Sequence, residues 1–149
     1  MKDKNIGKLL SIIHRNLSMF MDHSIPAEGI GHGQKRLLIE IALHPGRTQE
    51  EVAECFLKDK TTIARAVKGL EKNGYITKRQ NPEDLREYLL FPTEKGLAVL
   101  PFALQARNKA IEELTKGFSE EEYEILEDFL VRLAENAVNL RKKHLTKSS

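Results

Sequence analysis

Residues 48–75 constrain the fold more than any other part of the chain, because they contain two amphipathic runs separated by a short polar break. Thr48 and Glu51 have the spacing of a capping box, in which each side chain accepts a hydrogen bond from the other residue's backbone N–H. The first helix is predicted to close at about Leu57, and Asp59 is a favourable N-cap for a second. Two helices joined by about three residues form a helix-turn-helix.

The sequence before and after this motif predicts further elements. Apolar residues at helical spacing predict a helix from about Ile6 to His23, and residues 34–46 indicate a short, largely buried helix that ends in Pro-Gly. Residues 75–80 and 87–92 are rich in β-forming side chains and are joined by turn residues, which predicts a β-hairpin.

Two more helices are predicted after the hairpin. Thr93 opens the first, and Pro101 should bend it or mark a restart. Ser119 and Glu122 form a capping box for the second, whose apolar residues run from Leu126 to Leu140. The apolar side of the first is predicted to comprise Leu97, Leu100, Leu104, Ile111 and Leu114.

The composition is typical of one globular domain, residues 1–149, with 40% hydrophobic and 31% charged residues. No apolar run approaches the roughly 18 residues that span a bilayer. The N-terminus is too charged for a signal peptide, so we expect a cytoplasmic protein without membrane contact. The net charge of +2 is unevenly distributed: residues 58–88 hold eight Lys/Arg against five Asp/Glu, and residues 119–137 hold one against seven. The net positive charge of residues 58–88 therefore favours binding to a polyanion.

The second helix of the motif has a basic outer face. Ile63, Val67 and Leu70 are predicted to face inward. A glycine at position 69 lowers helix stability by about 1 kcal/mol relative to alanine. Relief of crowding would explain why a glycine is present there. The other face carries Thr61, Arg65, Lys68 and Lys72. A helix of this kind fits the major groove of B-form DNA, where Thr and Arg can hydrogen-bond base edges.

The hairpin is basic as well, with Lys78 and Arg79 on its first strand and Arg86 near its tip. Directly after a helix-turn-helix, such a hairpin could insert a cation into the adjacent minor groove. The alternative for the helix alone is an ordinary solvated face, but the combination with a basic hairpin favours DNA binding.

Three successive stretches resemble the MarR/SlyA family of winged helix-turn-helix transcriptional regulators. They are HPGRTQEEVAECF, KDKTTIARAVKGLEKNGYITKRQ and NPEDLREYLLFPTEKG. They are similar to the family's first motif helix, its recognition helix with the first wing strand, and its wing with the following Thr-Glu-Lys-Gly helix start. The resemblance extends over nearly the whole chain.

The resemblance implies a mainly α fold with a small β-hairpin wing, in which residues 34–92 form the winged helix-turn-helix. It implies dimerisation helices in residues 1–25 and 94–145, which intertwine with those of a second subunit. A two-fold homodimer should bind double-stranded DNA at a pseudo-palindrome with half-sites roughly 10 bp apart. Repression is the family's usual mode.

By position in the family's motifs, Thr61, Thr62 and Arg65 are similar to recognition-helix contacts. Arg86 matches the wing-tip arginine, and Asp84 is expected to orient it rather than contact DNA. The lysines are assigned to phosphates, which add affinity and salt sensitivity. The full predicted DNA-binding set is Thr48, Lys60, Thr61, Thr62, Arg65, Lys68, Lys78, Arg79 and Arg86.

Members of this family respond to small anionic aromatic compounds, to peroxide through a cysteine, or to zinc. For an anionic aromatic ligand, Lys8, His14 and Arg15 could supply cations beside apolar walls from Ile12 and Leu37. The alternative is that these cations are simply solvated.

Cys55 lies away from the N-terminal helix that carries the family's peroxide-sensing cysteine, and we interpret it as a small buried core residue. The histidines are spread over several elements, so neither a metal site nor a cofactor is predicted.

Two other functions compete with DNA binding. An enzyme is disfavoured, because the chain has no Gly-rich phosphate loop, GxSxG or HExxH motif. A winged-helix module that binds protein or RNA is the remaining alternative. An acidic or apolar outer face on residues 61–72 would favour a protein partner, whereas this face is basic.

Overall fold

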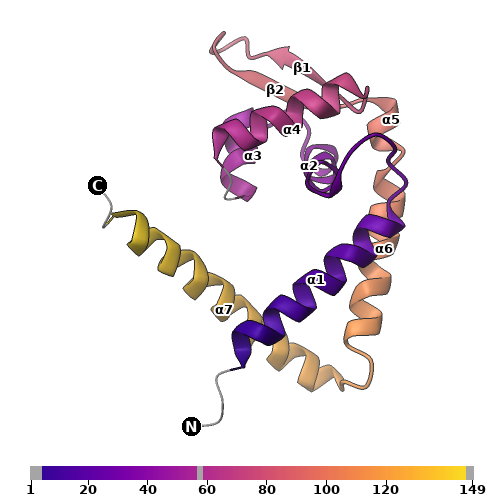
Figure 1. Cartoon of the computed structure of the whole chain (residues 1–149), viewed down its shortest axis with the longest axis vertical. Coiled ribbons are helices and arrows are strands. Elements are labelled where there is room, and N and C mark those ends of the chain that lie inside the picture. The colour runs from indigo at the N-terminus through magenta and orange to yellow at the C-terminus, as the bar shows by residue number, and fades with distance from the viewer. Residues whose placement is uncertain (1–4, 57–58, 147–149) are drawn as a thin grey trace. The chain divides into compact units, whose positions relative to one another are not determined.

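The structure is a computed structural model that describes residues 5–56 and 59–146 (Figure 1). The chain divides into two compact units, Met1–Ala110 and Ile111–Ser149. Within the described residues the elements are α1 (Ile6–Ser24), α2 (His32–Leu43), α3 (Gln49–Phe56), α4 (Lys60–Lys72), β1 (Ile76–Gln80), β2 (Tyr88–Pro92), α5 (Glu94–Leu97), α6 (Leu100–Leu114) and α7 (Glu120–Thr146). The predicted order of helices and hairpin is confirmed, and no described helix is long and apolar enough to cross a membrane.

Both helix starts of the helix-turn-helix are capped as predicted. The Thr48 backbone N–H donates to Glu51 Oε2 at 2.8 Å, and the Glu51 N–H donates to Thr48 Oγ1 at 3.1 Å. Asp59 caps α4 by accepting from the Thr62 N–H at 2.8 Å. These bonds satisfy N–H groups that have no partner inside the helix. The predicted end of the first helix at Leu57 lies outside the described residues.

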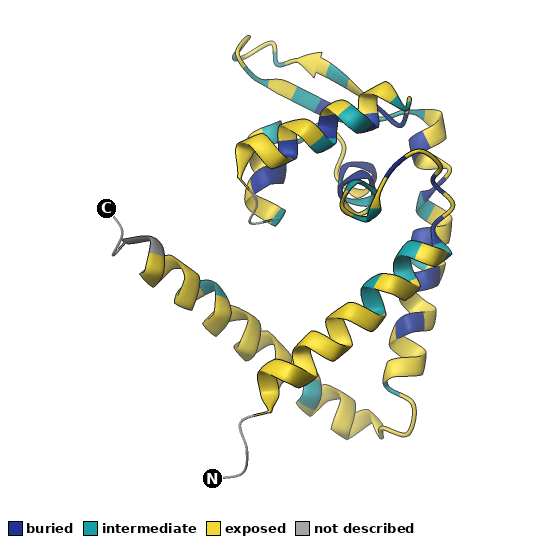
Figure 2. Cartoon of the chain, viewed as in Figure 1, coloured by how far each residue is buried: buried dark blue, intermediate teal, exposed yellow. Residues whose placement is uncertain are grey.

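The core of the first unit lies among α2, α3, α4 and the hairpin (Figure 2). Ile63, Val67 and Leu70 face inward from α4, which confirms the predicted inner face. The largest fully buried side chains are Leu37, Leu38, Ile41, Val52, Val67, Leu70, Ile76 and Leu90. Burying each such side chain contributes about 1.5–3 kcal/mol, so this core holds α4 firmly against its neighbours.

The hairpin is fixed to the start of α3. β1 pairs antiparallel with β2, with Lys78 opposite Leu90. The Leu90 N–H donates to the Arg47 carbonyl at 2.9 Å, and the Gly46 N–H donates to the Leu90 carbonyl at 2.8 Å. Together with the isolated antiparallel bridge between Thr48 and Leu89, these bonds attach the wing to the segment before α3.

Two glycines allow close packing around α4 and α5. A Cβ at Gly69 would meet the side-chain amide of Gln34, so the end of that flexible side chain would have to move. A Cβ at Gly96 would collide with the backbone carbonyl oxygen of Tyr75. Gly96 is thus required where α5 crosses the chain that enters the hairpin.

The helix after the hairpin restarts near Pro101. α5 ends at Leu97 and α6 begins at Leu100, so Pro101 lies in the first turn of α6, where its missing N–H costs little. The predicted apolar side of this region is wrong for packing within the chain. Its buried residues are Ala103, Ala106 and Ala110, whereas Leu97, Ile111 and Leu114 are exposed. Small alanines permit a closer approach to the core than leucines do.

The second unit contains α7, which begins with the predicted capping box. The Ser119 N–H donates to Glu122 Oε2 at 2.9 Å, and the Glu122 N–H donates to Ser119 Oγ at 3.2 Å. Most residues of this helix are exposed (Figure 2). The exposed large apolar residues along it include Ile125, Phe129, Leu130, Val131, Leu133 and Leu140. In the first unit, α1 likewise has no buried residue, although apolar side chains recur along it.

Candidate nucleic-acid interface

The outer face of α4 presents three of the predicted residues without internal partners. Thr61, Arg65 and Lys68 are exposed, and their side chains make no hydrogen bond or ion pair with any described residue. The rigid core behind α4 fixes where these side chains emerge. They are therefore available to an outside partner at no cost of breaking an internal contact.

The first turn of α4 is different, because its predicted residues already have partners. Lys60 Nζ lies 2.9 Å from Glu50 Oε1, and this contact raises the pKa of Lys60 through the hydrogen bond and the negative charge of Glu50. The Thr62 hydroxyl donates to Asp59 Oδ2 at 2.7 Å, and bonds from Thr62 lower the pKa of Asp59. Thr62 must give up its bond to Asp59 before its hydroxyl can donate elsewhere, whereas the charge of Lys60 is balanced by Glu50 although its ammonium has further N–H donors.

The wing tip holds Arg86 in a fixed orientation. Its Nε and one terminal nitrogen donate to the two carboxylate oxygens of Asp84, each at 3.0 Å. The Arg86 backbone N–H also donates to Asp84 Oδ1, at 3.1 Å. The expected orienting role of Asp84 is thus confirmed, and the bonds from Arg86 lower the pKa of Asp84. The side chain of Arg86 remains 89% exposed.

The two cations of β1 point to opposite faces of the hairpin, since successive strand residues alternate. Lys78 Nζ lies 3.4 Å from Glu71 Oε2 and 5.4 Å from the centre of the Tyr88 ring. The Arg79 guanidinium stacks 4.5 Å from the centre of the Phe91 ring. Lys78 and Arg79 therefore present their charges on different faces of the wing, and the assignment of both to DNA stays a prediction.

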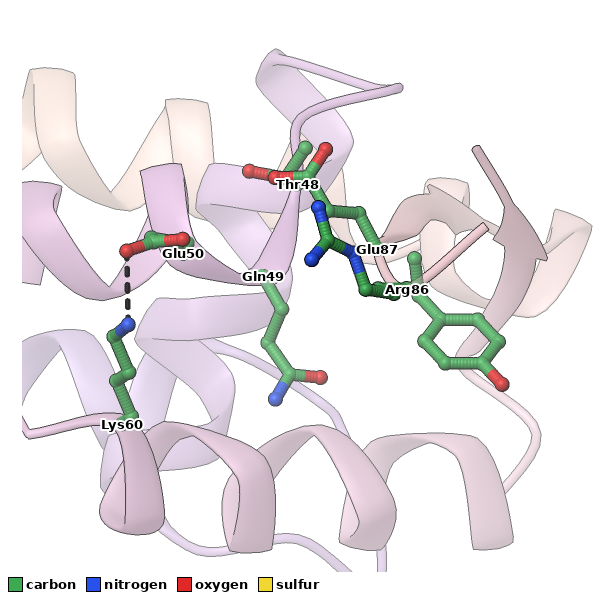
Figure 3. Close-up of a pocket in the computed structure, with 7 residues that line it drawn as sticks. Thr48, Gln49, Glu50, Lys60, Arg86 and Glu87 are labelled. Carbon is green, nitrogen blue, oxygen red and sulfur yellow. Dashed lines mark ion pairs between the residues drawn. The ribbon is translucent and has the colours of Figure 1, made fainter. Parts of the chain in front are cut away.

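A cleft opens between the start of α3, the start of α4 and the wing (Figure 3). We call it the α3–α4 cleft; it is lined by Thr48, Gln49, Glu50, Lys60, Arg86, Glu87 and Tyr88. Thr48 lines it, although its hydroxyl already caps α3. The Gln49 side chain extends into the cleft. The sequence analysis did not identify Gln49 as a site residue, although its position directly after the N-cap Thr48 places it at the start of the helix.

The predicted ligand residues are only partly brought together. A second cleft of about 310 Å³, the α1–α2 cleft, lies between α1 and α2 and is lined in part by His14. Arg15 lines the adjoining hollow on α1. Leu37 is 1% exposed and belongs to the core rather than to a pocket wall. Lys8 and Ile12 are exposed on α1 and line neither hollow.

Two cations of α2, Lys35 and Arg36, line the α1–α2 cleft, whereas the predicted Lys8 does not. The sequence analysis did not identify these two residues. Arg36 lines the α1–α2 cleft with its guanidinium 5.7 Å from the centre of the Phe56 ring, and it has no carboxylate partner in the described part of the chain. Lys35 Nζ lies 3.3 Å from Asp22 Oδ1 and donates to the Asp22 carbonyl at 2.9 Å. Lys35 and Arg36 directly follow Gln34 at the start of a predicted helix, and this position was the only feature of the sequence that pointed to a role in the cleft.

The interpretation of Cys55 as a buried core residue is wrong. α3 buries Val52 and Ala53, and Cys55 lies on its other side, exposed. Its Sγ accepts a hydrogen bond from the Arg47 guanidinium at 3.3 Å. As for metals, residues 5–56 and 59–146 contain no group of three or more His, Cys, Asp or Glu that could hold an ion.

The profile of the MarR family matches residues 28–87, which span α2 to the wing tip. The HTH-type transcriptional regulator YybA of Bacillus subtilis is 34% identical over 132 residues, which cover 89% of this chain and 88% of that protein. The chain belongs to the MarR family. It is a winged helix-turn-helix transcriptional regulator, in a family of regulators rather than enzymes.

Solved structures agree with this assignment. A MarR-family regulator of Listeria monocytogenes in complex with a 26-mer DNA is 34% identical with a TM-score of 0.83, covering 93% of this chain and 91% of that one. The transcriptional regulator SlyA is 30% identical with a TM-score of 0.82, covering 90% and 94%. MarR-family members of this fold therefore bind duplex DNA.

Proposed function

We propose that this MarR-family protein is a cytoplasmic homodimeric repressor that binds a pseudo-palindromic operator. The observation that carries the proposal is the outer face of α4, which has no partner among the described residues, together with a wing arginine that is hydrogen-bonded to Asp84. Thr61 and Arg65 contact base edges in the major groove, and Lys68 contacts a phosphate. Arg86 enters the adjacent minor groove, where a narrow A·T tract attracts a cation.

The remaining predicted residues take secondary roles in this proposal. Thr48 caps α3 at the rim of the cleft, and Arg79 on the outer face of the wing contributes long-range attraction to DNA. Lys78 attaches the wing to α4 through Glu71. Thr62 contacts DNA as an acceptor, because its hydroxyl proton is donated to Asp59.

Exposed apolar side chains support the homodimer. α1 in the first unit and α7 in the second each expose a series of large apolar residues, and monomeric proteins rarely leave such long apolar stripes in water. A second copy of the chain would cover them. Two recognition helices related by a two-fold axis then favour half-sites roughly 10 bp apart.

The test is fluorescence anisotropy with duplex DNA from upstream of the protein's own gene and with a scrambled duplex, at several salt concentrations. We expect two chains per duplex, preference for the native sequence and a steep loss of affinity with salt. Equal and weak binding to both duplexes would mean either that the operator lies elsewhere or that the basic face of α4 meets another partner, such as a protein or RNA.

We also propose that a small anionic aromatic ligand regulates DNA binding from the α1–α2 cleft. Arg36 supplies a guanidinium beside the Phe56 ring that is unpaired as far as residues 5–56 and 59–146 extend, and His14 and Arg15 add cations from α1. A ligand changes DNA affinity only if it binds the two states of the dimer unequally.

Calorimetric titration with benzoate-type acids tests the ligand proposal. Arg36→Ala should weaken binding more than Lys8→Ala, since Lys8 lies outside both hollows. If the two variants bind an aromatic acid equally well, the ligand site lies elsewhere.

A further inference from the structure

An ion pair spans one end of the α3–α4 cleft. Glu50 is the second residue of α3, and Lys60 is the first residue of α4. Their side chains meet at 2.9 Å, and both are largely exposed, 54% and 77% respectively (Figure 3). Arg86 lines the same cleft. The pair therefore lies on the surface that the proposed function gives to DNA.

This pair differs from the other lysine pair near α4. Lys78 is largely covered, and Tyr88 flanks its ammonium, so its pairing with Glu71 belongs to the packing of the wing. The Glu50–Lys60 pair has no such cover. Exposed pairs of this kind contribute little to stability, and their partners exchange readily with solvent or with other ions.

The surroundings of Lys60 leave Glu50 as its direct partner. Asp59 is adjacent in sequence, but both of its carboxylate oxygens accept bonds from Thr62. Glu54 acts on Lys60 only through its charge. By contrast, Arg65 and Lys68 on the same helix are unpaired within the described residues.

We propose that Glu50 is a specificity-determining residue that masks Lys60 from DNA by occupying the position of a phosphate. The proposal rests on DNA binding as the function. While Glu50 balances the charge of Lys60, the lysine does not neutralise a phosphate and the DNA keeps the counterion it would otherwise release, so Lys60 adds less to sequence-independent affinity. Lys60 transfers to a phosphate more readily on a sequence where base contacts from α4 hold the duplex in register.

Masking lowers affinity for random DNA more than affinity for the operator. Specificity is a ratio of two affinities, and suppressing the wrong complex raises it as effectively as strengthening the right one. Because competing non-specific sites are far more numerous than operators, one masked lysine per subunit has a measurable effect on occupancy.

The experiment compares wild type, Glu50→Gln, Lys60→Gln and the double variant by anisotropy, across a salt series. The operator duplex is selected by the wild-type protein from a random-sequence library, and a scrambled duplex serves as the non-specific probe. We expect Glu50→Gln to tighten binding to the scrambled duplex by about two- to five-fold for each lysine released, the scale of one exposed pair. The slope of log K against log salt concentration for the scrambled duplex should steepen by about 0.9 for each released lysine. The operator should gain less, so the specificity ratio should fall.

The double variant decides whether Glu50 acts through Lys60. If masking is correct, Glu50→Gln has no effect in the Lys60→Gln background. A gain that persists there means that Glu50 repels DNA directly, and it overturns the proposal. Glu28→Gln is the matched control, since Glu28 is exposed and lies between α1 and α2; it should change neither affinity nor slope.

Failure of this proposal can be distinguished from failure of the proposed function. If wild type prefers its selected duplex but Glu50→Gln changes nothing, the masking role is wrong and DNA recognition stands. If wild type shows no preference for any duplex, both are overturned. Thermal unfolding of each variant checks that the fold is intact.

Discussion

The Tyr75 hydroxyl donates a hydrogen bond to the backbone carbonyl oxygen of Glu28 at 2.8 Å. The two residues are 47 positions apart, and the bond joins the connection between α1 and α2 to the segment after α4. The Lys95 ammonium lies 4.2 Å from the centre of the same ring and donates to the Asn73 carbonyl at 2.8 Å. One buried tyrosine thus links three elements around the end of the recognition helix.

Tyr75→Phe should therefore lower the free energy of unfolding by about 1 kcal/mol, because it keeps the ring and removes only the hydroxyl that satisfies the Glu28 carbonyl. Urea unfolding measures this. Tyr88→Phe is the matched control, since the Tyr88 hydroxyl has no hydrogen-bond partner within the described residues, and its unfolding should be unchanged. Equal losses for both variants would contradict a specific role for the Tyr75 bond.

Gly96→Ala should destabilise the protein by about 1–3 kcal/mol, because the new methyl group must displace the Tyr75 backbone or α5. Gly33→Ala offers the opposite case on α2, where a Cβ meets nothing within 4 Å. Ala is favoured over Gly in a helix by about 1 kcal/mol, so this variant should be slightly more stable. Thermal unfolding of the two variants tests the expected loss of stability in Gly96→Ala and the expected gain in Gly33→Ala. If both variants lose stability, the close approach at Gly96 is not the cause.

Local rules predicted the helix-turn-helix well, because its caps join residues only three positions apart, as in Thr48–Glu51 and Asp59–Thr62. Contacts between elements were not predictable in the same way. The partner of Lys60 is Glu50 on another helix, and that depends on how α3 and α4 cross. Strand alternation places Lys78 and Arg79 on opposite faces, but their different partners, Glu71 and Phe91, depend on how the wing packs. The exposure of Cys55 depended on which side of α3 the core occupies.

Asp84→Asn should weaken DNA binding by loosening Arg86, and the wild-type pair should hold across neutral pH. Arg86 keeps the pKa of Asp84 below its usual 3.8, so the pair is fully formed above that value and is lost only as pH falls through the lowered pKa. Anisotropy from about pH 5 to about pH 8 should therefore show no titration from Asp84.

Arg86→Ala should weaken binding at least several-fold with unchanged thermal unfolding. Unchanged affinity in Arg86→Ala would remove the wing from the mechanism.

Arg65→Ala and Lys68→Ala should separate base recognition from phosphate contact, although both cations lie unpaired on the outer face of α4, as far as the described residues extend. Losing an arginine that forks onto a guanine should cost about 1–3 kcal/mol on the operator and relax preference at that base pair. Removing a lysine that binds a phosphate should weaken all duplexes alike and reduce the salt slope by about 1 for each such lysine. Anisotropy with the selected operator, single-base variants of it and a scrambled duplex measures both quantities. If Lys68→Ala changes base preference while Arg65→Ala changes only the salt slope, the recognition helix enters the groove with a different rotation, one that points Lys68 rather than Arg65 at the bases.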